Sequence, residues 1–139
     1  TKEDIDAIIA LNLNSVIYGS RVFAEVMKQQ KNGIIINISS VCAKHAWGGW
    51  SVYAAAKAGV LAFTKGLYVE LQKHGVRATC LIPASASTGF QSAAHLAETN
   101  DSLSVDDIAS AIYYAANLPE RAVVEEMTVW GTSQVVEPL

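Results

Sequence analysis

The chain has 139 residues, of which 51% are hydrophobic and 17% charged, with a formal net charge of −3 at pH 7. This length predicts one domain, spanning 1–139, with a substantial core. The composition excludes a disordered chain, and the acidic balance argues against nucleic acid as a partner. No run of about 18 apolar residues and no basic leader is present, so we expect no membrane association. Cys42 and Cys80 lack metal-site spacing and are expected to be reduced thiols in a cytoplasmic protein.

The first elements alternate between helical and strand patterns. Apolar residues from about 2 to 30 recur at helical spacing, and Thr1 with Asp4 can form a capping box. The Lys-Asn-Gly run at 31–33 is typical of a helix end with a glycine that tolerates the left-handed conformation. The β-branched run 33–39 predicts a strand buried on both faces. A loop rich in Ser, Gly and aromatic residues follows, and then a helix over 52–73 that His74-Gly75 ends.

The second half repeats this alternation. A buried strand is predicted over 76–83, stopped by Pro83, followed by a surface loop over 84–103 that is a candidate lid. Ser104 and Asp107 form a second capping-box pattern, opening a helix to about Asn117. The last strand is predicted over 122–130. This order, with long crossovers, predicts an α/β fold with a parallel sheet and helices on both faces.

Three side chains stand out chemically. Tyr53 and Lys57 lie four residues apart near the start of a helix, so they project from the same face. A nearby ammonium group favours the phenolate and lowers the pKa of a tyrosine, which makes it a usable acid and base. Ser40 follows the strand over 33–39, where parallel sheets place their ligands, and its hydroxyl can hydrogen-bond a carbonyl oxygen.

The run NISSVCAKHAWGGWSVYAAAKAG, over 37–59, closely resembles the active-site segment of short-chain dehydrogenases/reductases. In that family a strand ending in N-x-S-S leads through a loop to Y-x-x-x-K, with the catalytic serine thirteen residues before the tyrosine. Ser40 fits this spacing, and Ser39 is its structural neighbour. The resemblance implies the C-terminal part of a Rossmann-like doubly wound parallel sheet.

The resemblance extends to other segments. Asn12 matches the family asparagine that maintains a water-mediated proton relay to the active-site lysine. The segment from Pro83 to Thr88 resembles the P-G-x-x-x-T segment that contacts the nicotinamide end of the cofactor, together with Tyr53 and Lys57. Ala84 replaces its glycine, which is unfavourable if a positive φ is required there.

The resemblance implies an NAD(P)-dependent oxidoreductase that interconverts a small alcohol and a carbonyl compound. Tyr53 acts as the acid/base, Lys57 lowers its pKa and binds the nicotinamide ribose, Ser40 polarises the carbonyl, and Asn12 holds the relay. The cofactor is NADP or NAD, with NADP favoured weakly, and no metal is needed. The C-terminal stretch from residue 104 is similar to a subgroup that acts on 3-hydroxy acids, serine and similar small alcohols.

The chain has no G-x-x-x-G-x-G run, which in this family cradles the cofactor pyrophosphate. We therefore expect the N-terminal half of the cofactor domain to be absent and this chain alone to bind a dinucleotide weakly. The small-residue face of the helix over 52–73 is expected to form a homodimer or homotetramer contact, as is common in the family. An alternative is a non-catalytic association module.

The sequence leaves two interpretations for the tryptophans and one for the histidines. Trp47 and Trp50 each form either a substrate-pocket wall or ordinary packing, because both precede Tyr53 in the loop. The histidines are not spaced as metal ligands, and we expect surface or loop roles for all three: His45, His74 and His95.

Overall fold

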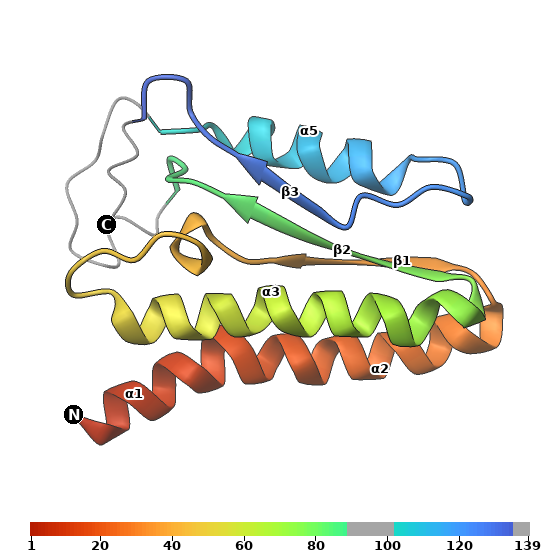
Figure 1. Ribbon diagram of the computed structural model, residues 1–139, viewed down its shortest axis with the longest axis horizontal. Coiled ribbons are helices and arrows are strands. Elements are labelled where there is room, and N and C mark those ends of the chain that lie inside the picture. Colours follow the sequence, from red (N-terminus) through yellow and green to blue (C-terminus); the bar gives the residue numbers. More distant parts are fainter. Residues whose placement is uncertain (89–101, 135–139) are drawn as a thin grey trace.

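The computed structural model describes residues 1–88 and 102–134 of the chain. Within these residues, three parallel strands form one sheet in the order β1 (Gly33–Ile38), β2 (Val76–Pro83) and β3 (Glu126–Val129). Helices α2 and α3 lie on one side of the sheet and α5 lies on the other (Figure 1). The predicted α/β fold, with a parallel sheet and helices on both faces, is confirmed.

The first helical segment is continuous but not uniform. It consists of α1 (Lys2–Ile9), a π-helical turn η1 (Ala10–Asn14) and α2 (Ser15–Gln30). The predicted capping box is present, since the backbone N–H of Asp4 donates to Oγ1 of Thr1 at 3.2 Å. The spacing of apolar residues predicted the helix but not the π turn.

The end of this helix differs from the prediction. The residue in the left-handed conformation is Lys31, with φ 54°, and not the glycine two positions later. Gly33 begins β1 with φ 152°, and a Cβ atom there would lie 2.5 Å from Sδ of Met27. This glycine therefore permits close packing of β1 on the helix that precedes it.

The segment Lys2–Gln30 is also the one helix of the described residues that is long and apolar enough to cross a membrane, with a mean hydropathy of 1.3 over its most apolar window. This criterion considers only length and composition, and a helix that packs on a sheet can also meet it. Here Ala24 is buried in the core and Ser20 hydrogen-bonds to β1. The contacts therefore describe a helix that covers the sheet.

The second helix, α3 (Ser51–Leu71), crosses from β1 to β2 and ends in the short 3-10 helix η3 (Gln72–His74). As predicted, Gly75 ends this helix in the left-handed conformation, with φ 74°. A short 3-10 turn, η2 (Val41–Ala43), lies in the loop before α3.

The last helix and strand complete the sheet. Helix α5 (Val105–Ala116) begins with the predicted capping box of Ser104 and Asp107. The final strand is shorter than the predicted range 122–130, because it pairs with only four residues of β2. The carbonyl of Ala122 instead accepts a hydrogen bond from the guanidinium group of Arg77, at 3.2 Å. The central part of the predicted loop 84–103, including His95, lies outside the described residues.

The core has two clusters on the sheet. The first packs α2 and α3 against the amino-terminal half of the strands, and the second lies nearer their carboxyl ends. The members are Ala24, Ile35, Leu67, Leu71, Val76 and Ala78 in the first cluster, and Val41, Cys80, Ile82, Ala84 and Leu103 in the second.

A buried polar network joins three of these elements. Nδ2 of Asn37 on β1 donates to Oγ1 of Thr64 on α3 at 3.0 Å, and its Oδ1 accepts from Oγ of Ser20 on α2 at 3.1 Å. The Thr64 hydroxyl in turn donates to the carbonyl of Val60 at 2.7 Å. Buried polar groups need such partners, so the network fixes the relative positions of the two helices just before the strand ends.

Candidate active site

The two serines that follow β1, Ser39 and Ser40, make different contacts. Ser39 is 3% exposed, its N–H donates to the carbonyl of Leu81 at 2.7 Å, and its hydroxyl donates to the carbonyl of Lys57 at 2.8 Å. Ser40 is the N-cap of η2, and its Oγ accepts from the N–H of Cys42 at 3.2 Å. Ser39 thus fastens the strand to α3, while Ser40 stands at the carboxyl end of β1.

Tyr53 and Lys57 lie one turn apart at the start of α3 and meet Ser40 there. Nζ of Lys57 is 5.6 Å from the centroid of the Tyr53 ring and donates to the carbonyl of Ile38 at 3.2 Å. A hydrogen bond with Ser40 acts on the Tyr53 hydroxyl and opposes the effect of burial on its pKa. The fold therefore brings together the three side chains that the sequence singled out.

The electrostatics of this group differ from the expectation. Burial raises the pKa of Tyr53 above its ordinary value of 10.0, and the hydrogen bond from Ser40 offsets only part of that. Burial also lowers the pKa of Lys57 below 10.5. The ammonium group of Lys57 lies beside the Tyr53 ring and donates to the Ile38 carbonyl, and burial outweighs any lowering of the pKa of the phenol. The phenol is protonated at neutral pH, which is the state that gives a proton.

Asn12 lies in the π-helical turn η1, which packs against α3. Its Nδ2 donates to the carbonyl of Ile8 at 3.1 Å. The next residue, Leu13, fills the space beside Gly59, where a Cβ atom would lie 3.0 Å from its two methyl carbons. The π turn therefore packs on α3 at Gly59, two residues after Lys57 in the sequence. The relay role of Asn12 remains a prediction.

The segment after β2 tolerates alanine in place of the family glycine. Ala84 is 9% exposed, and its N–H donates to the carbonyl of Val129 at 2.9 Å. The one non-glycine residue with positive φ in the described ranges is Lys31, so Ala84 carries no such strain. Thr88 is exposed and closes the first described range, while Pro83 is the last residue of β2. Contact of Pro83, Ala84 and Thr88 with a cofactor stays a prediction.

The aromatic residues of the loop before α3 have separate environments. Trp47 packs against the second core cluster, and His45 contacts Trp130 with ring centroids 5.7 Å apart. Trp50 instead lies edge-on to Tyr53, with centroids 5.5 Å apart and an interplanar angle of 74°. Of the two tryptophans left open by the sequence, Trp47 is a packing residue and Trp50 adjoins the candidate site.

One ionic contact near the site was not anticipated. The carboxylate of Glu126 on β3 pairs with Nζ of Lys44, from the loop before α3, and with Nζ of Lys65, from α3, at 2.7 Å. These hydrogen bonds hold the pKa of Glu126 below its ordinary value. The sequence contains one signal of these ion pairs: a carboxylate lies in an otherwise apolar strand, and a buried carboxylate needs a cationic partner.

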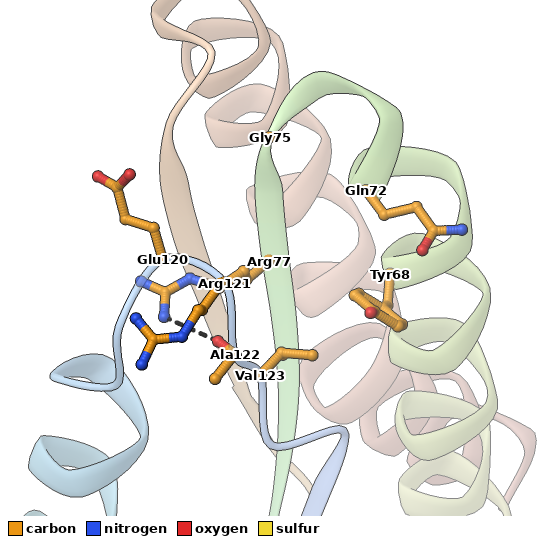
Figure 2. Close-up of a pocket in the computed structure, with 8 residues that line it drawn as sticks. All are labelled: Tyr68, Gln72, Gly75, Arg77, Glu120, Arg121, Ala122 and Val123. Carbon is orange, nitrogen blue, oxygen red and sulfur yellow. Dashed lines mark hydrogen bonds between the residues drawn. The ribbon is translucent and has the colours of Figure 1, made fainter.

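The pocket drawn in Figure 2 lies away from the candidate active site. It has a volume of about 160 Å³ and lies at the amino end of β2, beside η3 and the chain before β3. Two of its lining residues are Arg77 and Arg121. Nη1 of Arg77 donates to the carbonyls of Leu118 and Ala122, at 3.0 and 3.2 Å. This arginine therefore has a structural role, since it holds the segment between α5 and β3 against β2. The pocket contains none of Ser40, Tyr53 and Lys57.

The donor set at the carboxyl end fits the hydroxyl-rich nicotinamide ribose of a dinucleotide. An ammonium group has three N–H donors, and one of those of Lys57 is used, on the Ile38 carbonyl. The Tyr53 ring lies next to this ammonium group, and the Tyr53 hydroxyl is hydrogen-bonded with Ser40. Lys57 therefore has N–H donors left that would hold a ribose hydroxyl.

Comparison with known proteins agrees with this geometry. A family model described as short chain dehydrogenase matches residues 1–99. An uncharacterized oxidoreductase of Staphylococcus aureus is 32% identical over 127 residues, covering 91% of this chain and 54% of that protein. Tropinone reductase-like 2 of Erythroxylum coca is 36% identical over 99 residues, covering 71% of this chain and 36% of that protein.

Solved structures show the same fold. The closed form of serine dehydrogenase complexed with NADP⁺ has a TM-score of 0.90 at 23% identity, covering all of this chain and 60% of that one. A short-chain dehydrogenase from Sphingobium yanoikuyae in complex with NADPH has a TM-score of 0.80 at 28% identity, covering 91% and 49%. The chain spans about half the length of most of these relatives. The family model, which matches more than half of the chain, shows that the chain belongs to the short-chain dehydrogenase family.

Proposed function

We propose that the protein containing this chain interconverts a small alcohol and a carbonyl compound, using NADP or NAD. The observation that carries the proposal is the meeting of Ser40, Tyr53 and Lys57 at the carboxyl end of β1. The structural neighbours bound to NADP⁺ and NADPH support NADP as the favoured cofactor.

In this proposal the bound cofactor supplies or accepts the hydride. Tyr53, protonated at neutral pH, gives its proton to the carbonyl oxygen during reduction and takes it back during oxidation. Ser40 donates a hydrogen bond to the same oxygen and stabilises its developing charge. Lys57 binds the nicotinamide ribose, and its positive charge stabilises the phenolate left after proton transfer.

The test is Tyr53→Phe in the full-length protein, assayed by NADPH consumption with a panel of small ketones and aldehydes. We expect turnover to fall by about a hundredfold or more, because the acid/base is removed while the ring is kept. Tyr113→Phe is the matched control, since Tyr113 is 71% exposed on α5. Undiminished turnover in Tyr53→Phe would contradict the proposal.

We also propose association through the outer faces of α2 and α3. Tyr18, Val22 and Val26 form one exposed stripe at spacings of four on α2, with exposed fractions of 67, 65 and 50%. Val69 on α3 is 62% exposed. Apolar stripes of this size favour a homodimer or homotetramer. Val22→Glu should shift the sedimentation velocity of the protein toward that of a monomer, whereas Glu3→Gln, on exposed α1, should not.

The second candidate is an association module without catalysis, favoured by the exposed apolar stripe on α2. Titration of the 139-residue chain with NADPH, followed by cofactor fluorescence, separates the two candidates for this chain. Weak or undetectable binding is expected, and micromolar binding would show that the chain holds a cofactor by itself.

A further inference from the structure

We infer that Trp50 makes this site select uncharged carbonyl substrates with a flat apolar substituent over substrates that carry a carboxylate. The inference rests on the proposed function, because it concerns the substrate that Tyr53 would protonate. It departs from the small hydroxy acids that the C-terminal resemblance ranks first. Two sets of observations support it, namely the fixed position of the indole and the distribution of cationic side chains.

The indole of Trp50 packs against the ring of Tyr53. The two ring centroids are 5.5 Å apart in an edge-on contact, so we expect a substrate bound at Tyr53 to contact the indole. Trp50 is partly exposed. An aromatic face gains stabilisation from flat apolar groups, and a carboxylate next to it loses hydration without gaining a partner.

The backbone around Trp50 is fixed. Its N–H donates to the carbonyl of Trp47 at 3.1 Å, and its own carbonyl accepts from the N–H of Ala54 at 2.8 Å. Trp47 is packed against the second core cluster, and Lys44 is paired with Glu126. These contacts fix the backbone that carries Trp50, and the edge-on packing on Tyr53 orients the indole. Preorganised contacts discriminate between substrates more strongly than mobile ones.

A carboxylate substrate needs a cationic partner, and this chain offers few near Tyr53. All ten lysine and arginine residues fall within the described ranges. Arg77 and Arg121 line the pocket at the amino end of β2 (Figure 2). Arg21 is exposed on α2.

The lysines nearer the site are already engaged. Lys44 and Lys65 share the carboxylate of Glu126, and Lys2 pairs with Asp6. Lys57 remains beside Tyr53 and is required for the cofactor ribose under the proposed function. A carboxylate bound here would compete for that ammonium group, whereas a neutral ketone would not.

The experiment compares two carbonyl compounds in the full-length protein with NADPH. Acetophenone is neutral and flat, and acetoacetate carries a carboxylate. We expect kcat/KM for acetophenone to exceed that for acetoacetate in the wild type. Trp50→Ala should reduce this ratio by about two- to tenfold, the factor that an aromatic contact of about 0.5–1.5 kcal/mol corresponds to. Trp50→Phe should restore most of it. The ratio within one preparation does not depend on the fraction of folded enzyme.

The outcomes separate this inference from the proposed function. Turnover that favours acetoacetate, with a ratio unchanged in Trp50→Ala, overturns the substrate preference and leaves the oxidoreductase activity standing. A wild type that reduces neither these compounds nor any other carbonyl, although it binds NADPH, overturns the proposed function and with it this inference. A lowered ratio in Trp50→Ala that Trp50→Phe restores supports both.

Discussion

Replacing Asn37 by leucine tests whether the buried polar network holds the site in place. Leucine keeps the approximate shape of the side chain but removes both hydrogen bonds, to Ser20 and to Thr64. Each bond contributes about 1 kcal/mol, and a stranded buried group costs about 1–3 kcal/mol. The Ser20 hydroxyl is 4% exposed and loses its acceptor, whereas Thr64 still donates to Val60. The expected loss in the free energy of unfolding is therefore about 2–4 kcal/mol.

The assay is equilibrium unfolding in urea at neutral pH. A loss of this size should lower the midpoint by about 1–2 M with an unchanged slope. Asn32→Leu is the matched control, because Asn32 is exposed, and its effect should stay within about 0.5 kcal/mol.

A triple variant sharpens this test. Ser20→Ala removes the hydroxyl that Asn37→Leu strands, and Thr64→Val makes the rest of the site apolar at the loss of the bond to Val60, so the triple variant should be at least as stable as Asn37→Leu alone. A single variant as stable as the wild type, or a triple variant less stable than the single one, would refute the reasoning.

Two further predictions concern stability. Gly75→Ala should destabilise the protein by at least about 1–2 kcal/mol, because φ is 74° there and the new Cβ would lie 2.5 Å from the carbonyl oxygen of Lys31. Gly66→Ala, in open space within α3, should raise the thermal midpoint by contributing about 0.5–1 kcal/mol; equal shifts in both variants would contradict this contrast. Glu126→Gln should be less stable than the wild type at pH 7. Since the pKa of Glu126 is depressed in the folded state, its contribution is present above the ordinary value of 4.5 and is lost as pH falls below it. The difference in stability, measured by urea unfolding, should therefore shrink as the pH falls below 4.5, and a difference that stays constant would exclude the mechanism.

The sequence predicted the elements well because their signals are local. Both capping boxes, the glycine that ends α3 and the strand predicted over 33–39, which is observed over Gly33–Ile38, are confirmed. Each depends on residues within a few positions of one another, so spacing and residue type suffice.

What the sequence missed depends on contacts between distant segments. The pairing of Glu126 with Lys44 joins residues 82 positions apart, and the hydrogen bonds of Arg77 that shorten the last strand span 41 and 45 positions. The pKa of Tyr53 is raised because burial outweighs its local partner. Burial is a property of the folded chain, and the spacing of Tyr53 and Lys57 could not reveal it.

The π-helical turn at Ala10–Asn14 is equivalent to one residue inserted into an α-helix. Each residue of an α-helix advances the side chains by about 100°, so this insertion turns the whole of α1 by that angle relative to α2. Deleting one residue from the turn would leave the helix intact but present a different side of α1 to α3. The side of α1 that faces the start of α3, where Tyr53 lies, thus depends on the number of residues in the π turn. It does not depend on the identity of any single residue in that turn.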